Sequence, residues 1–203
     1  MRQQSSEDPK IDADVIDSVK KGERAAFELI VRSFQPELLR AAYSHLGKVE
    51  HAEEVVQETF VNVFKSIHTF DQRFSFRTWI WTILINQCRQ RYKRLQRFPK
   101  TDGGIQSSDA KTEWDTAECN LLDPQKAAQL SERNEQLRQI LGNLPEVQAT
   151  ALRLRFFGSL KFQEIADSMG CSLSSAKNRV KLGLQALSQV LTNSDLIVGE
   201  NER

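Results

Sequence analysis

The chain has 203 residues, with 28 lysines and arginines against 27 aspartates and glutamates, for a formal net charge of +1. This length suggests one or two domains, and 9 glycines and 5 prolines are too few for a loop-rich or all-β scaffold. We therefore expect an all-α protein. Its longest apolar stretch, residues 79–85, is far shorter than the ~20 residues of a membrane span, and the polar start predicts no signal peptide.

Cysteine and histidine patterns give no sign of catalysis or metal binding. Cys88, Cys119 and Cys171 lie too far apart for a zinc motif or a disulfide framework, which fits a reducing, cytoplasmic location. The 3 histidines belong to no recognisable catalytic motif, and no phosphate-binding glycine loop occurs. We expect no catalytic residue, no metal site and no cofactor, and therefore no enzyme.

The first half of the chain predicts a helical domain over residues 14–98, after a polar tail at 1–13. Hydrophobic periodicity gives helices over 14–21, 24–46, 50–67 and 76–97, with glycines or a proline at their ends. Pro36 falls inside the second helix and should kink it, because proline removes an internal hydrogen bond.

Charge is distributed unevenly along the chain. Residues 72–101 hold eight basic residues and no acid, and residues 102–135 have a net charge of −5. Periodicity is lost in this acidic stretch, so we predict a flexible acidic linker over 99–130. Helical patterning returns at 125–143, 146–157, 162–169 and 172–191, which predicts a second domain over 131–191. The tail at 192–203 should fray.

Residues 162–182 have the pattern of a helix-turn-helix. A short apolar-faced helix is followed by Gly170, which suits a left-handed turn, and by Ser172, a favourable N-cap. The second helix should bury Ala176, Val180, Leu184, Leu187 and Leu191. Its outward face then carries serines, Asn178 and Lys181, flanked by Lys177 and Arg179, as a helix that enters the DNA major groove would. The alternative is a helical hairpin with a solvated basic face.

Two further helix faces suggest binding surfaces. Residues 74–100 combine aromatic side chains with clustered arginines and lysines, a combination that suits unstacked bases and their phosphates. The alternative is that Trp79 and Trp81 belong to the core. In the helix over 50–67, carboxylates lie opposite the apolar arc; this acidic stripe would repel DNA but could meet a basic protein surface, or it is an ordinary solvated face.

The order of these segments resembles the extracytoplasmic-function (ECF) group of bacterial RNA polymerase sigma factors. The resemblance lies in KKGERAAFELIVRSFQPELLRAA, AEEVVQETFVNVF, FSFRTWIWTILIN and LPEVQATALRLRFFGSLKFQEIADSMGCSLSSAKNRVKLGLQAL, which follow one another in this order. It implies that the first domain binds the β′ clamp helices of RNA polymerase and captures and melts the −10 promoter element. The second domain would bind the β flap and read the −35 element. The acidic linker resembles the family's segment in the RNA exit path.

The resemblance also assigns residues to these tasks. The loop over 69–75 would receive a flipped −10 base. The polymerase-facing residues would be Glu53, Glu54, Gln57 and Glu58. The −10 and melting residues would be Phe74, Arg77, Trp79, Trp81, Asn86, Arg89 and Lys93. The −35 residues would be Ser174, Ser175, Lys177, Asn178, Arg179 and Lys181.

The implied partners are core RNA polymerase, promoter DNA and an anti-sigma protein in some relatives, with no membrane association. Two positions depart from the family pattern. Gln90 stands where many relatives have aspartate, and Lys161 stands where a serine or threonine usually caps the first helix of the helix-turn-helix. The alternative function is a stand-alone helix-turn-helix regulator that binds operators without polymerase.

Overall fold

The computed structural model describes residues 11, 13–97, 135 and 138–199, with side chains to residue 189. The described residues are helical and contain no strand, which confirms the all-α prediction. The helices are α1 (Ala13–Lys20), α2 (Arg24–Leu46), α3 (Val49–Ser66), the short 3₁₀ helix η1 (Ile67–Thr69), α4 (Phe76–Arg97), α7 (Glu146–Phe156), α8 (Phe162–Met169) and α9 (Leu173–Gly199). The predicted linker and most of the predicted helix over 125–143 lie outside the described residues.

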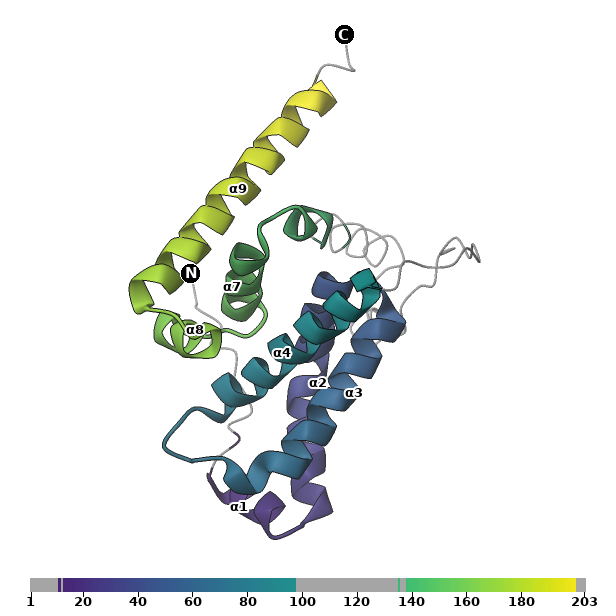
Figure 1. Cartoon of the computed structure of the whole chain (residues 1–203), viewed down its shortest axis with the longest axis vertical. Helices are drawn as coiled ribbons and strands as arrows, with labels where there is room; N and C mark the ends of the chain where they lie inside the picture. The colour runs from purple at the N-terminus through teal and green to yellow at the C-terminus, as the bar shows by residue number, and fades with distance from the viewer. Residues whose placement is uncertain (1–10, 12, 98–134, 136–137, 200–203) are drawn as a thin grey trace, which may run out of the picture.

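The first helical unit is a three-helix bundle closed at one end by α1. Figure 1 shows α2, α3 and α4 side by side, with α1 across their lower end. Each helix turns one apolar face inward, so that Ile30, Leu38, Val55 and Ile80 are almost fully buried, and burial of such side chains supplies most of the stability of short helices. Pro36 lies inside α2 without ending it.

The second unit consists of α7, α8 and α9. Gly170 ends α8 with φ 58°, and its N–H donates to carbonyls of the last turn, which is the left-handed ending that glycine allows. Lys161 does not prevent the start of α8, since the Glu164 carboxylate accepts a hydrogen bond of 2.7 Å from the Lys161 backbone N–H. The α8–turn–α9 arrangement is the predicted helix-turn-helix.

Helix α9 differs from the prediction in two respects. Its buried stripe passes through Ala176, Val180 and Gly183 rather than Leu184, which is exposed. A helix of 3.6 residues per turn alternates steps of four and three, and at Gly183 α9 crosses close to Leu152, only 2.8 Å from the place of an added Cβ. The helix also continues past residue 191 to Gly199, because no proline or earlier glycine stops it there.

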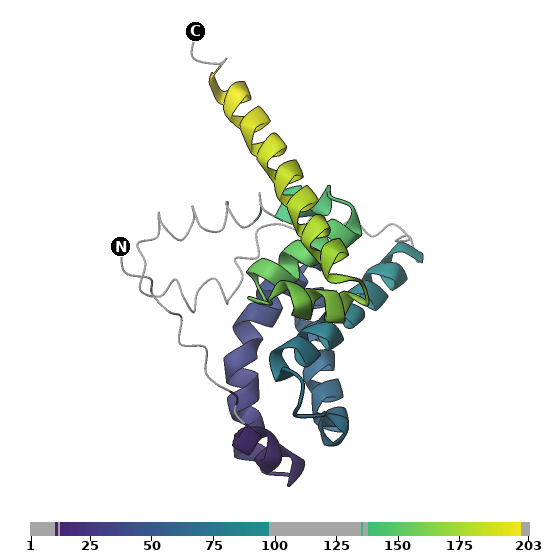
Figure 2. The same cartoon turned by 90° about the vertical axis from the view of Figure 1, so that its left-hand side faces the viewer.

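The two units pack against each other, and the C-terminal part of α9 projects away from both (Figures 1 and 2). The contact is made mainly by α8 lying on α4, and one contiguous apolar core runs through both units. A second contact joins Tyr43 of α2 to Glu135, whose carboxylate accepts a hydrogen bond of 3.3 Å from the Tyr43 hydroxyl. None of the described helices is long and apolar enough to cross a membrane.

Candidate functional site

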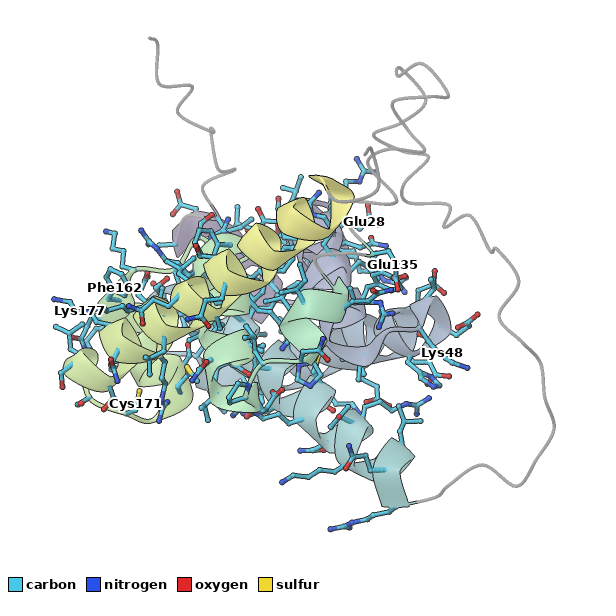
Figure 3. The ribbon with its side chains drawn as sticks, turned by 90° about the horizontal axis from the view of Figure 1, so that it is seen from above. Glu28, Lys48, Glu135, Phe162, Cys171 and Lys177 are labelled. Carbon is cyan, nitrogen blue, oxygen red and sulfur yellow. The ribbon has the colours of Figure 1, made fainter. Side chains whose placement is uncertain are left out.

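The first turns of α9 present the predicted −35 residues on an open surface. Lys177, Asn178 and Lys181 are exposed, and Arg179 is half-buried with its guanidinium 4.0 Å from the sulfur of Met169. Figure 3 shows Lys177 at the same end of the molecule as Phe162 and Cys171, far from Lys48. The helix therefore offers two lysines and an asparagine to a ligand without any rearrangement.

Ser172 fixes the start of this helix, as the sequence predicts. Its hydroxyl accepts a hydrogen bond of 3.2 Å from the Ser175 backbone N–H and lies 3.0 Å and 2.9 Å from the hydroxyls of Ser174 and Ser175. The two predicted DNA-contacting serines are thus engaged in capping. Phosphate oxygens near a helix start would meet unpaired backbone N–H groups there.

An aromatic pocket lies beside the segment predicted to receive a −10 base. It has a volume of 330 Å³ and is lined by Ile11, by residues of α1, by Phe34 of α2 and by six residues between positions 70 and 77. Phe74 is 69 % exposed, whereas Trp79 is half-buried and packs on Phe70 and Phe76, with ring centroids 5.0 Å and 5.6 Å away. The loop itself is tied by Asp71, whose carboxylate accepts a hydrogen bond of 2.9 Å from Arg73 Nε; this contact holds the pKa of Asp71 below its usual value.

The remaining predicted −10 residues do not share one face of α4. Asn86 and Lys93 are exposed, and Asn86 lines a separate groove against the end of α3. Arg89 is partly exposed and lies 4.0 Å from Glu146. Arg77 donates to the Glu37 carboxylate at 2.7 Å and to the Gly158 carbonyl at 3.3 Å.

Trp81 is completely buried, because the second unit covers its side of α4. The segment after α7 approaches so closely that a Cβ on Gly158 would come within 3.0 Å of the Trp81 ring. This burial agrees with the alternative that Trp81 belongs to the core, although the pattern of α4 by itself does not distinguish Trp81 from Trp79. In this arrangement Trp81 is out of reach of DNA.

Hydrogen bonds along α4 and α8 hold the two units together. The Thr78 hydroxyl donates to the Glu164 carboxylate at 3.1 Å, and the hydroxyl oxygens of Thr82 and Ser168 are 2.9 Å apart. Glu164 therefore serves both the start of α8 and the contact between units.

A buried arginine makes a further polar contact between the units. Arg153 of α7 donates to the hydroxyl and the carbonyl of Ser44 in α2, at 3.0 Å and 2.8 Å. Desolvation lowers the pKa of Arg153 and, together with the charges of Arg153 and Arg89, lowers the pKa of His45 to about 3. His45 is therefore neutral, although Glu146 lies 3.7 Å from its ring.

The neighbouring thiol is inert. Cys88 is buried in the same region, and burial raises its pKa to about 12, so that it stays protonated and unreactive. Among the residues that the structure describes, no three His, Cys, Asp or Glu side chains are grouped so that they could hold a metal ion.

The acidic stripe of α3 borders an apolar groove between α2 and α3. All four predicted polymerase-facing residues are exposed, and Glu53 and Gln57 line this groove of 530 Å³. Glu54 forms an ion pair with Arg91 of α4. Phe64 and Val61, 51 % and 44 % exposed, also line the groove. They lie outside the apolar arc expected to be buried, on the side of α3 that carries Glu53 and Gln57, and the sequence pattern assigned them no role.

Comparisons with known proteins agree with this arrangement. Residues 30–98 match the sigma-70 region 2 family and residues 134–187 match the sigma-70 region 4 family. The chain is 28 % identical over 181 residues to the RNA polymerase sigma-H factor of Pseudomonas aeruginosa, covering 89 % of this chain and 93 % of that protein. It is 26 % identical over 176 residues to the ECF sigma factor SigW of Bacillus subtilis, covering 87 % and 94 %.

Two solved structures share the fold. CnrH, in complex with the cytosolic domain of CnrY, superposes with a TM-score of 0.66 at 22 % identity and covers 88 % of this chain and 96 % of its own. The sigma factor RpoE of Bartonella quintana, in complex with the anti-sigma factor NepR, has a TM-score of 0.57 at 22 % identity and covers 82 % and 96 %.

Proposed function

The chain belongs to the extracytoplasmic-function group of RNA polymerase sigma factors, and on this premise we propose which of its surfaces contact DNA and polymerase. Proteins of this group are transcription initiation factors and not enzymes. We assign residues 14–98 to the domain that binds the polymerase clamp and the −10 element, and 131–191 to the domain that reads the −35 element. The proposal is supported by the matches to sigma-70 region 2 and region 4, which follow one another in this order along the chain.

The second domain reads −35 DNA through the exposed face of α9. Lys177, Lys181 and Arg179 supply the cationic groups that contact phosphates or guanine edges, and Asn178 can pair with an adenine edge. Ser174 and Ser175 lie at the helix start, where their hydroxyls contact the capping Ser172 and where the helix end favours a phosphate. Since so few cations face the DNA, binding by the free chain should be weak, and its salt dependence should correspond to only a few released counterions.

The first domain captures a −10 base in the aromatic pocket beside residues 69–75. Phe74 offers an exposed ring and Trp79 supports the wall, and stacking on aromatic rings favours unstacked, single-stranded bases. Asn86, Arg89 and Lys93 lie farther along α4, where the strand beyond that base would pass. Arg77 supports the pocket through its contact with Glu37.

Core polymerase binds the groove between α2 and α3. The carboxylates of Glu53, Glu54 and Glu58 give this surface the charge needed for a basic partner, and the apolar lining supplies the buried area that makes such contacts stable. The β′ clamp helices are the partner of this surface, and the β flap is the partner of the second domain.

Both promoter elements can be reached only if the two domains separate. The elements lie about two helical turns, or about 70 Å, apart, whereas α4 and α8 are in direct contact here. Trp81 reaches DNA only after this separation. Polymerase would hold the domains apart at a fixed spacing, so that two weak sites act as one strong site.

Localisation and regulation follow from this role. A factor that serves RNA polymerase works in the cytoplasm, which supports the predicted location. The complex of the Bartonella RpoE with the anti-sigma factor NepR supports an anti-sigma partner for this chain as well. The predicted acidic linker, with its part in the RNA exit path, lies outside the described residues.

Reconstitution with core RNA polymerase tests the proposal. We expect the purified chain to co-purify with core enzyme and to give run-off transcripts from promoters mapped by start-site sequencing after overexpression. Core enzyme alone and chain alone are the controls. A chain that binds specific duplex DNA without core enzyme, and fails to bind core, would instead be a stand-alone helix-turn-helix regulator.

A further inference from the structure

We infer that His45 is a pH-sensitive switch between the two helical units: protonation of its ring weakens the contact of α7 with α2 and α4, so that mild acid separates the units. None of the DNA-binding or polymerase-binding surfaces proposed above includes His45. The switch can be tested without polymerase or promoter DNA, so its outcome does not depend on the proposed function.

His45 lies where α2, α4 and α7 meet. It belongs to the last turn of α2, and its side chain is only 2 % exposed. From α7, Glu146 Oε1 comes within 3.7 Å of His45 Nδ1, and Arg153 donates to the hydroxyl and the carbonyl of the preceding Ser44. From α4, the uncharged ring of Tyr92 packs edge-on, with ring centroids 5.7 Å apart. The His45 ring is therefore part of the contact between the units.

Positive charge dominates around this ring. Arg153 from α7 and Arg89 from α4 both disfavour a further positive charge on His45. The nearby carboxylate is that of Glu146, and it is already shared. It accepts a hydrogen bond of 2.8 Å from the Thr150 hydroxyl and lies 4.0 Å from Arg89 and 3.9 Å from Arg153. A protonated ring would thus face two cations and one carboxylate that both of them use.

The other titratable groups of this region bring no net charge. Cys88 stays protonated, because burial raises its pKa to about 12. Glu135, which accepts a hydrogen bond from the neighbouring Tyr43, is paired with Arg138 at 2.7 Å. A proton on His45 therefore adds an uncompensated positive charge to a buried contact.

The hydrogen bonding of the ring also fits the neutral form. Within the described residues His45 Nδ1 is buried without a hydrogen-bond partner. A protonated histidine carries an N–H donor on both ring nitrogens, and a buried charged donor without an acceptor is strongly disfavoured. Separation of the units takes α7 away from the ring, which removes Arg153 and admits water. The separated form is therefore the one that accepts the proton.

The direction and size of the effect follow from these contacts. With the units in contact, burial and then the charges of Arg153 and Arg89 hold the pKa of His45 at about 3, whereas a hydrated ring has a pKa of ~6.5. The contact is therefore retained above pH 6.5 and weakens below it. The ratio of separated to contacting chains should rise about tenfold between pH 7.5 and pH 5.5. Because the contact between the units also covers Trp81, acid would uncover this ring.

Thiol labelling at the contact measures separation even when the separated form is rare. In a chain with Cys119 and Cys171 replaced by alanine, Ser168→Cys places a thiol in the α4–α8 contact, and Gln163→Cys places one on the exposed face of the same helix. The ratio of their labelling rates with dithiodipyridine reports the separated fraction and cancels the pH dependence of the reagent. The rate of the parent chain, in which Cys88 is buried, is subtracted.

We expect this ratio to rise about tenfold from pH 7.5 to pH 5.5, and to stay constant in the His45→Asn variant. The chain has 3 histidines, so His51→Asn and His68→Asn are the matched controls, and both should keep the rise. Circular dichroism at each pH establishes that every variant is folded.

A ratio that does not rise with His45 present, or that rises equally in His45→Asn, would refute the switch. If His45→Asn does not fold, the double variant His51→Asn/His68→Asn decides, because His45 is then the remaining histidine. A retained rise supports the switch and a lost rise overturns it. A wild-type chain that directs no transcription with core polymerase would refute the proposed function and leave these labelling results unchanged.

Discussion

A disulfide between α4 and α8 would keep the two domains closed. The hydroxyl oxygens of Thr82 and Ser168 are 2.9 Å apart, and cysteine sulfurs at these positions need only a small shift to reach a bond of about 2.05 Å. In the double variant Thr82→Cys/Ser168→Cys, Cys171, which lies three residues after Ser168, and Cys119 should be replaced by alanine. Cys88 can stay, because burial raises its pKa to about 12.

The expected effect follows from distance. With α4 bonded to α8, the chain cannot span the ~70 Å between two promoter elements two helical turns apart. Loss of one of two linked sites commonly costs at least about 100-fold in effective binding. We therefore expect oxidation to reduce run-off transcription about 100-fold and reductant to restore it, while −35 duplex binding by the exposed α9 is retained.

Run-off transcription with oxidised and reduced protein provides the measurement, and the two single-cysteine variants are the matched controls. Non-reducing gel electrophoresis and thiol titration establish how much of the double variant is bonded. Full transcription by a completely oxidised double variant would refute the requirement for separation. A variant that is inactive even when reduced would be replaced by a bond at Thr78 and Glu164, the next contact along the same helices.

Three further predictions concern other surfaces. Lys177→Ala and Arg179→Ala should each lower the salt dependence of −35 binding by about one counterion; an unchanged slope in filter-binding titrations would mean that these side chains point away from DNA. Phe64→Asp should weaken binding to core polymerase more than Glu28→Gln, an exposed change outside the groove, as measured by co-purification. The pKa of His45 is about 3 in the folded chain and ~6.5 in the unfolded chain. The free energy of unfolding should therefore be constant above pH 6.5 and fall below it, by about 2 kcal/mol at pH 5. Urea unfolding of the His45→Asn variant should show no such decrease.

Local sequence signals were sufficient to predict several helices in both domains and the turn of the helix-turn-helix. The bounds of α2, α4 and α8 agree with those predicted, because caps, glycines and 3.6-residue periodicity act within a few residues. Ser172 and Gly170 behave as predicted for the same reason. The exposed cationic face of α9 can then be predicted, because it lies opposite the buried stripe of the same helix.

Local sequence patterns could not show which side chains are buried against the other domain. Trp79 and Trp81 lie two residues apart in α4. The Trp79 ring packs beside the aromatic pocket, whereas the Trp81 ring is buried against residues 158–160. The difference depends on which segment, some 80 residues later, lies against each face. The sequence likewise did not predict the hydrogen bond from the Gln72 amide to the Asp17 carboxylate, because a contact between residues 55 apart leaves no periodic signal.

The contact between the domains has the chemistry of a surface that can open. Besides Trp81, it buries Arg153. Within the described residues Trp81 Nε1 has no hydrogen-bond partner, and Arg153 Nη1 also lacks one, although it lies 3.9 Å from Glu146 Oε2. An unpaired buried polar group costs about 1–3 kcal/mol, and this cost is recovered when separation returns the group to water. The free energy of association at this interface is therefore less favourable than that of an apolar interface of equal area. A domain contact of this kind can keep Trp81 from solvent in the free chain and still yield to the larger surface of polymerase.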